Sequence, residues 1–194
     1  MKRSFSIFIP ILILTDQAIK IPISRLLTEH HECITLIKGV LFFCPKQNTH
    51  GGWIPSMLDF IVPAYITIPI TVFAVLLMIA AYRFMSYCTF NWDKYKNLPA
   101  IFLIMMLSGG FCSFIDDIFW GGSIDYIRLF DWFIFDLKDV YLTSAEVIVI
   151  IYLIVFIIYY YRLSKEERKE YDKKINMIKW LKSGMQSEHK KSGL

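Results

Sequence analysis

Blocks of consecutive apolar residues constrain this chain more than any other feature. A helix needs about 20 residues to cross roughly 30 Å of hydrocarbon. Four apolar blocks approach that length, at about residues 5–23, 60–82, 100–115 and 140–161. Charged residues make up only 20% of the chain, whereas a soluble domain has about 25%. The sequence therefore excludes a soluble enzyme, a disordered chain and a disulfide-dense secreted module, and it predicts a multi-spanning membrane protein.

The first apolar block has two interpretations. Lys2 and Arg3 precede it, as in a cleaved signal peptide, but no small-x-small cleavage site follows before Asp16. We therefore expect a retained span. The expected fold is an all-α membrane protein with four transmembrane helices, a small extracytoplasmic β-containing segment and a cytoplasmic C-terminal tail.

The distribution of lysine and arginine predicts the orientation of the chain. With both termini inside, 15 basic residues are cytoplasmic and five lie outside, namely Arg25, Lys38, Lys46, Arg128 and Lys138. This bias fits the positive-inside rule for an even number of spans. We expect residues 1–161 to form the membrane domain, with an outer loop at about 27–56, and residues 162–194 to form a basic cytoplasmic tail.

The tail carries ten basic and five acidic residues. A basic segment directly after a span typically faces anionic lipid. We therefore expect a solvated helix at the inner leaflet and no nucleic-acid partner. The charge also allows the tail to dock a protein partner.

The outer loop contains a segment typical of β structure. Residues 34–43 (ITLIKGVLFF) are rich in β-branched and aromatic side chains, which predicts a short strand or hairpin. Cys33 and Cys44 flank this segment. In an oxidising compartment they could pair, and two independent buried thiols are the alternative. No metal-ligand spacing appears in the chain, so we expect no metal.

Asp16 and Lys20 are ionisable residues within an apolar block, where an unpaired charge is costly. They lie four residues apart on one helix face and could neutralise each other. The alternative is that both face a polar cleft shared with other spans.

Six aspartates gather within 24 residues, between the third and fourth blocks. They are Asp116, Asp117, Asp125, Asp131, Asp136 and Asp139. Close carboxyl groups share protons because two adjacent carboxylates cannot both ionise cheaply. Aspartic-protease chemistry requires such a pair. A solvated acidic loop and a cation-binding mouth are the alternatives.

Short motifs in a fixed order resemble a known family. Asp16-Gln-Ala-Ile-Lys20 resembles D-x-x-x-K, and residues 48–53 (NTHGGW) are similar to N-x-G-A-A-F. Residues 108–117 (SGGFCSFIDD) resemble G-G-A-x-G-N-x-x-D-R. Residues 123–126 (SIDY) and 135–139 (FDLKD) are similar to V-V-D-F and F-N-x-A-D.

The family is bacterial lipoprotein signal peptidase (signal peptidase II), a four-span aspartic protease of the cytoplasmic membrane, and the resemblance covers about residues 8–160. It implies Asp125 and Asp139 as the catalytic pair, without cofactor or metal. The implied substrates are diacylglyceryl-modified prolipoproteins, cut just before the lipidated cysteine, with Trp53 and the 34–43 segment cradling them. The residues implied to shape the site are Asp16, Lys20, Asn48, Ser113, Asp116 and Asp136.

Four positions depart from the family pattern. Ser113 and Asp136 stand where asparagine is expected, Asp117 where arginine is common, and Lys138 where a small residue is usual. A third carboxylate at position 136 would raise the apparent pKa values of the catalytic pair unless Lys138 compensates.

The sequence thus predicts a membrane-embedded aspartic peptidase that removes lipoprotein signal peptides. A first alternative is a non-catalytic subunit of a membrane complex that uses the same groove to bind lipoproteins or transmembrane segments. A second is an ion-conducting or transport role for the acidic mouth.

Overall fold

The computed structural model describes residues 6–27, 33–49, 63–89, 94–130, 132–175 and 180. Trp53, Asp131, most of the 48–53 motif and the end of the basic tail lie outside the described residues. The chain divides into two compact units. The first comprises Met1–Val75 and Ile104–Thr143, and the second comprises Leu76–Leu103 and Ser144–Leu194.

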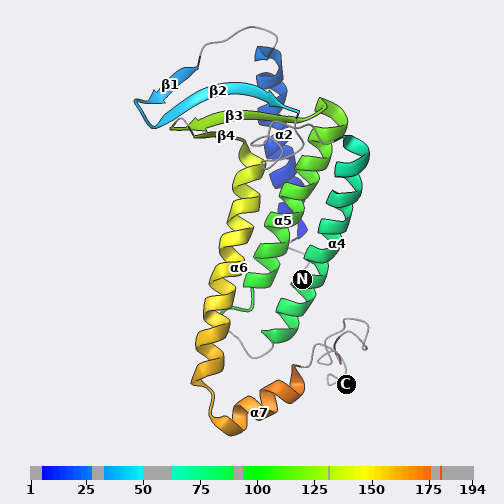
Figure 1. Cartoon of the computed structure of the whole chain (residues 1–194), viewed down its shortest axis with the longest axis vertical. Helices are drawn as coiled ribbons and strands as arrows, with labels where there is room; N and C mark the ends of the chain where they lie inside the picture. The colour runs from blue at the N-terminus through cyan, green and yellow to red at the C-terminus, as the bar shows by residue number, and fades with distance from the viewer. Residues whose placement is uncertain are drawn as a thin grey trace. The chain divides into compact units, whose positions relative to one another are not determined.

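The chain is mostly helical (Figure 1). The long helices are α2 (Phe8–Leu26), α4 (Ala64–Cys88), α5 (Leu98–Ile115) and α6 (Leu137–Arg162). Three helical segments of the described residues are long and apolar enough to cross a membrane: Ile68–Cys88, Leu98–Trp120 and Leu137–Arg162. These three agree with the second, third and fourth predicted spans. Helix α2 has 19 residues but is less apolar, since Asp16, Lys20 and Arg25 lie within it.

A four-stranded antiparallel sheet completes the first unit, with the order β1-β2-β3-β4. Its strands are β1 (Ile34–Ile37), β2 (Leu41–Asn48), β3 (Ser123–Leu129) and β4 (Phe133–Phe135). The predicted hairpin is present as β1 and β2, with Gly39 at a φ of 73° in its turn. No sequence pattern indicated that β3 and β4 extend this sheet, so the β structure is larger than expected.

The sheet lies across the end of α5 and the beginning of α6 (Figure 1). A small core of Ile23, Ile124 and Tyr126 packs the last turns of α2 against β3. Pairing of β2 with β3 brings Asn48 opposite Ser123 and Lys46 opposite Asp125. Segments that are about 75 residues apart in the sequence therefore meet at one end of the helices.

Helix α5 continues into η1 (Asp116–Trp120), a turn of π-helix. Turns of π-helix are rare in proteins, and those that occur are often found at functional sites. Gly121 ends η1 in the left-handed conformation. Gly122 follows at a φ of 145°, and a Cβ there would lie 2.5 Å from the Asn48 carbonyl oxygen. The close approach of β2 to this turn therefore requires glycine.

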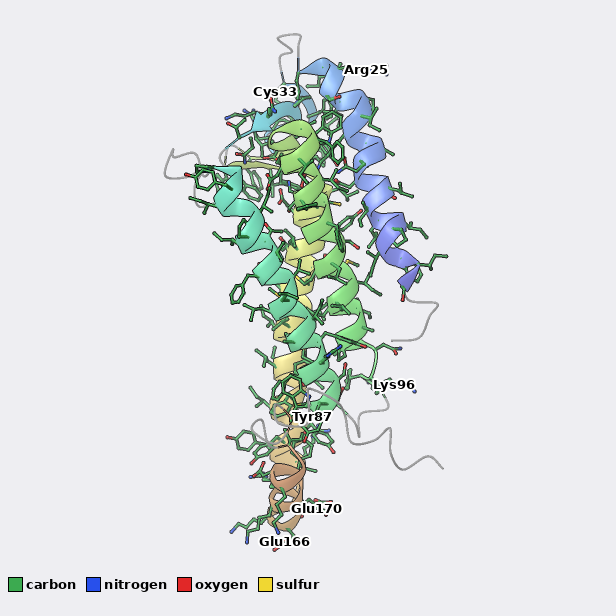
Figure 2. The ribbon with its side chains drawn as sticks, turned by 90° about the vertical axis from the view of Figure 1, so that its right-hand side faces the viewer. Arg25, Cys33, Tyr87, Lys96, Glu166 and Glu170 are labelled. Carbon is green, nitrogen blue, oxygen red and sulfur yellow. A yellow bond between two sulfur atoms is a disulfide. The ribbon has the colours of Figure 1, made fainter. Side chains whose placement is uncertain are left out.

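The second unit carries aromatic side chains whose hydroxyls bond backbone at the end of α4. Tyr152 donates to the Met85 carbonyl oxygen at 3.4 Å, and Tyr171 donates to that of Cys88 at 2.9 Å. Tyr171 belongs to α7 (Lys165–Lys174), which Ser164 and Glu167 cap reciprocally. The expected tail helix is present here, and Glu166 and Glu170 project from it (Figure 2).

Candidate active site

The polar residues of the first unit converge from five elements. Asp16 and Lys20 come from α2, Asn48 from the end of β2, Asp116 from η1 and Asp125 from β3. The residue before α6 and its first turn add Asp136, Lys138 and Asp139. All except Asn48 and Asp139 are buried, and those two are partly exposed. The site is therefore a buried group of charges with a partly open edge.

Lys20 stands at the centre of the buried charges. Its Nζ lies 2.9 Å from Asp16 Oδ2, 2.7 Å from Asp116 Oδ2 and 2.7 Å from Asp136 Oδ2. Pairing within α2 is therefore only part of its role, because two of its three acidic partners come from other elements. One lysine thus ties α2 to η1 and to the start of α6.

Lys138 is the second buried ammonium group. Its Nζ lies 2.7 Å from Asp136 Oδ2, 3.3 Å from Asp116 Oδ2 and 3.8 Å from Asp125 Oδ1. The two lysines thus contact the same oxygens of Asp116 and Asp136. We call Asp16, Lys20, Asp116, Asp136 and Lys138 the buried charge cluster. Burying a charge away from water is costly unless an opposite charge lies beside it. The ion pairs of this cluster largely compensate its charges in this way.

Asp125 and Asp139 meet at the open edge of this cluster. One carboxylate oxygen of each, together with one of Asp136, lies within 4.8 Å of the others. Two hydrogen bonds to one water span about 5.5 Å. A single water molecule can therefore bridge the carboxyl groups of Asp125 and Asp139.

Hydrogen bonds from two neighbouring strands orient Asp125. Asn48 Nδ2 donates to Asp125 Oδ2 at 3.2 Å, and Ser123 Oγ donates to Asp125 Oδ1. Burial raises the pKa of the Asp125 carboxyl above its ordinary value, against the opposing effects of the Lys138 ammonium and these hydrogen bonds. Asp125 therefore retains a proton at a higher pH than an exposed aspartate does.

Asp139 is fixed by a capping box. Asp136, which immediately precedes α6, accepts a hydrogen bond from the Asp139 backbone N–H at 3.1 Å. Asp139 Oδ2 accepts one in return from the Asp136 backbone N–H at 3.2 Å. This reciprocal pattern satisfies two N–H groups that the first turn of a helix leaves unpaired. The same contacts set the position of the Asp139 carboxyl.

Asp136 places a third carboxyl group beside this pair. Burial alone would raise the pKa of its carboxyl, but the ammonium groups of Lys138 and Lys20 outweigh that effect and hold the pKa below its ordinary value. The negative charge of Asp136 is thus compensated by both lysines. These two ammonium groups also repel cations, so we assign no metal to the three neighbouring carboxylates.

The hydrogen bond of the Ser113 side chain does not go to any of the other expected site residues. Its hydroxyl donates to the Gly109 carbonyl oxygen at 3.1 Å, within its own helix. Conversely, the site includes Gln17 and Ser123, to which the sequence assigned no role. Gln17 Nε2 donates to Asp116 Oδ1 at 3.3 Å, and its Oε1 accepts from Trp120 Nε1 at 3.0 Å. The sequence pointed to these two residues only through the motifs that contain them, residues 16–20 for Gln17 and residues 123–126 for Ser123.

The two outer cysteines lie in the same unit. Cys33 and Cys44 are joined by a disulfide, which ties the start of β1 to β2. Figure 2 labels Cys33 on the sheet and Arg25 near the end of α2. The described residues also include two buried free cysteines, Cys88 and Cys112.

Comparison with protein families identifies one family for this chain. Its model, described as signal peptidase (SPase) II, matches residues 8–156. Two similar solved structures are each described as a bacterial membrane enzyme determined by the in meso method, one at 2.3 Å and the other at 1.9 Å resolution. The first superposes with a TM-score of 0.61 and 19% identity, covering 79% of this chain and 89% of its own. The second gives 0.57 and 17%, covering 79% and 94%. A search of curated proteins found no significant match.

Proposed function

Since the chain belongs to the signal peptidase II family, an aspartic peptidase family of bacterial membranes, we propose that it is an active lipoprotein signal peptidase. It cleaves diacylglyceryl-modified prolipoproteins just before the lipidated cysteine. Asp125 and Asp139 are the catalytic pair. The observation that carries this proposal is the approach of their carboxylate oxygens to within 4.8 Å at the open edge of the buried charge cluster.

The reaction is the hydrolysis of one peptide bond, with one proton shared by the pair. The ionised carboxyl accepts a proton from the bridging water while the water oxygen attacks the peptide carbonyl carbon. The protonated carboxyl donates to the carbonyl oxygen, which gives a neutral gem-diol. The carboxyl that took the proton from water then protonates the amide nitrogen as the C–N bond breaks, while the other carboxylate accepts a proton from one gem-diol hydroxyl. The released products are a carboxylic acid and an amine, and the pair again shares one proton. Such proton transfers contribute about a hundredfold to ten-thousandfold to the rate.

The other site residues hold the pair in this state. Asn48 and Ser123 donate to Asp125, and Asp136 fixes Asp139 through the capping box. The buried charge cluster binds η1 and the start of α6 to α2, so the elements that carry the pair cannot separate cheaply. Removing one partner of such a buried ion pair costs about 3–5 kcal/mol.

The membrane topology belongs to the same proposal. Helix α2 is the fourth span, with Asp16 and Lys20 turned to the other helices and not to lipid. This placement is supported by their complete burial and by their contacts with Asp116 and Asp136. With four spans, both termini are cytoplasmic and the sheet lies on the outer side.

The test is expression in bacterial cells that lack their own lipoprotein signal peptidase. The wild-type chain is expected to convert accumulated prolipoprotein to the shorter form, whereas Asp125→Asn and Asp139→Asn are expected to leave the precursor intact. Glu166→Gln, which neutralises an exposed acid on α7, is the matched control. Precursor that persists with a correctly inserted wild-type chain would instead indicate a subunit that binds lipoproteins without cutting them.

A further inference from the structure

Lys138 has no part in the proton transfers described above, yet its Nζ lies within 3.8 Å of carboxylate oxygens of Asp116, Asp125 and Asp136. We propose that Lys138 is a positioning residue that sets the charge state of the catalytic pair. It does so by neutralising Asp136 and by orienting the hydroxyl of Ser123 toward Asp125. This inference rests on the proposed function and extends it, because it concerns two side chains outside the pair itself.

The geometry around Ser123 is the first support. Lys138 Nζ donates to Ser123 Oγ, so one lone pair of the hydroxyl is occupied by a cationic donor. The single hydroxyl proton then has two acceptors, Asp125 Oδ1 and Asp136 Oδ2, and the contact with Asp136 is the longer at 3.2 Å. Because Lys138 already donates to Asp136 Oδ2 at 2.7 Å, the hydroxyl proton is directed to Asp125. A continuous path therefore runs from Lys138 through Ser123 to Asp125.

A lysine beside a serine could also suggest a serine nucleophile with a lysine base. Such a base must be uncharged to accept a proton. Lys138 has carboxylate oxygens of Asp136, Asp116 and Asp125 within 3.8 Å, and these stabilise its charged form. The geometry therefore fits a fixed cationic donor.

The capping role of Asp136 explains why a cation is needed at this position. Asparagine caps a helix about as well as aspartate, but aspartate adds a full negative charge next to Asp125 and Asp139. The charged groups next to Asp125 are Lys138, Asp136 and Asp139 at the start of α6 and Lys46, its partner on β2. Asp16 and Lys20 of α2 and Asp116 of η1 belong to the same buried charge cluster as Asp136 and Lys138. Lys20 is shared among three acids. Lys138 also contacts three acids, but one of them is Asp125, so Lys138 is the cation that lies beside both Asp136 and the catalytic pair.

The test is a double-mutant cycle on the pH dependence of cleavage by the purified full-length protein. Lys138→Ala leaves Asp136 with Lys20 alone, which Asp16 and Asp116 also contact, so both limbs of the pH–rate profile are expected to move to higher pH by about one unit. Asp136→Asn keeps the cap and removes the negative charge, so both limbs are expected to move to lower pH. The double variant restores the charge balance, and its profile is expected to return to within about 0.3 unit of wild type. Lys165→Ala, at an exposed lysine of α7, is expected to leave the profile unchanged.

Ser123→Ala tests the path through the hydroxyl. If Lys138 acts through Ser123, Lys138→Ala is expected to lower kcat less in the Ser123→Ala background than in the wild type. Equal losses in the two backgrounds, or shifts of the same sign for Lys138→Ala and Asp136→Asn, would overturn the proposal.

Thermal unfolding of the same four proteins, measured in detergent, separates this inference from the proposed function. Lys138→Ala is expected to lower the Tm, and Asp136→Asn in the same chain is expected to recover part of the loss, whether or not the protein cleaves anything. If the wild type cleaves prolipoprotein but the double variant keeps the shifted pH–rate profile of Lys138→Ala and recovers none of its Tm loss, the inference fails and the proposed function stands. If the coupling is present and cleavage is absent, the proposed function fails and the charge compensation stands.

Discussion

Asp136 and Asp139 cap each other at the first turn of α6, through hydrogen bonds of 3.1 and 3.2 Å between each carboxylate and the other residue's backbone N–H. A common local device for starting a helix thereby sets the position of one member of the carboxylate pair. The first turn of α6 is for this reason also part of the proposed catalytic site. Changes to the cap should appear in the chemistry as well as in the stability.

The cap can be tested separately from its charge. Asp136→Ala and Asp136→Asn both remove the charge, but only Asp136→Ala also removes the acceptor for the Asp139 N–H, so it is expected to be about 1 kcal/mol less stable than Asp136→Asn. It is also expected to reduce cleavage more than Asp136→Asn, which keeps an acceptor. Cleavage rates and Tm values of the two variants provide the comparison. Equal rates for both would show that the capping contact does not position Asp139.

Lys20 is expected to be the most important single residue for the stability of the first unit. Lys20→Met leaves Asp16, Asp116 and Asp136 without their common cation, and the loss of a buried ion-pair partner costs about 3–5 kcal/mol. The Tm in detergent should fall by several degrees. Lys38→Met, at an exposed turn position, is the control. If both substitutions lower the Tm by the same small amount, the buried charge cluster does not stabilise the first unit.

Gly122 should tolerate no side chain. In Gly122→Ala the new Cβ would lie 2.5 Å from the Asn48 carbonyl oxygen, which forces the end of β2 away from the turn and moves Asn48 relative to Asp125. We expect weaker cleavage together with a lower Tm.

Gly39→Ala is the matched control for Gly122→Ala. Gly39 also has a positive φ, but its position is open, so strain of about 1 kcal/mol is expected without loss of activity. Full activity of Gly122→Ala would mean that the contact between Asn48 and Asp125 is not needed.

Asp125 should make the stability fall as the pH rises. Its pKa in the folded protein is above the ordinary value, so between the two pKa values the folded state binds more protons than the unfolded state. Its contribution is fully present below the ordinary aspartate pKa of about 3.9, and it is lost as the pH rises through the higher folded value. Asp125→Asn removes this titrating group. Between pH 4 and neutrality, the Tm of the variant should therefore decline less than that of the wild type, by the amount expected for about one titrating group. Parallel Tm curves for the two proteins would contradict the pKa direction.

The sequence predicted the parts of this protein that depend on local pattern. The lengths of the apolar blocks predicted the three helical segments Ile68–Cys88, Leu98–Trp120 and Leu137–Arg162, with ends that differ by up to eight residues, because hydropathy and helix length are properties of one segment. The β1–β2 hairpin followed from β-branched and aromatic residues in the same way.

The features that the sequence did not predict depend on contacts between distant segments. Strands β3 and β4 exist because β3 pairs with β2, and a segment dense in aspartate gave no reason to expect a strand there. The hydrogen bond from Lys138 to Ser123 joins residues that are 15 positions apart in the sequence. Ser123 begins β3, and Lys138 lies in the first turn of α6. Nothing in the structure explains Asp117 at the position where the motif usually has arginine.

The most direct measurement of the central claim is cleavage of a purified diacylated prolipoprotein by the purified chain in lipid nanodiscs, with the products identified by mass spectrometry. The account predicts a new N-terminus at the lipidated cysteine, and rates at least about a hundredfold lower for Asp125→Asn and for Asp139→Asn. Cleavage at an undiminished rate by either variant, or no product from a folded wild-type chain, would contradict it.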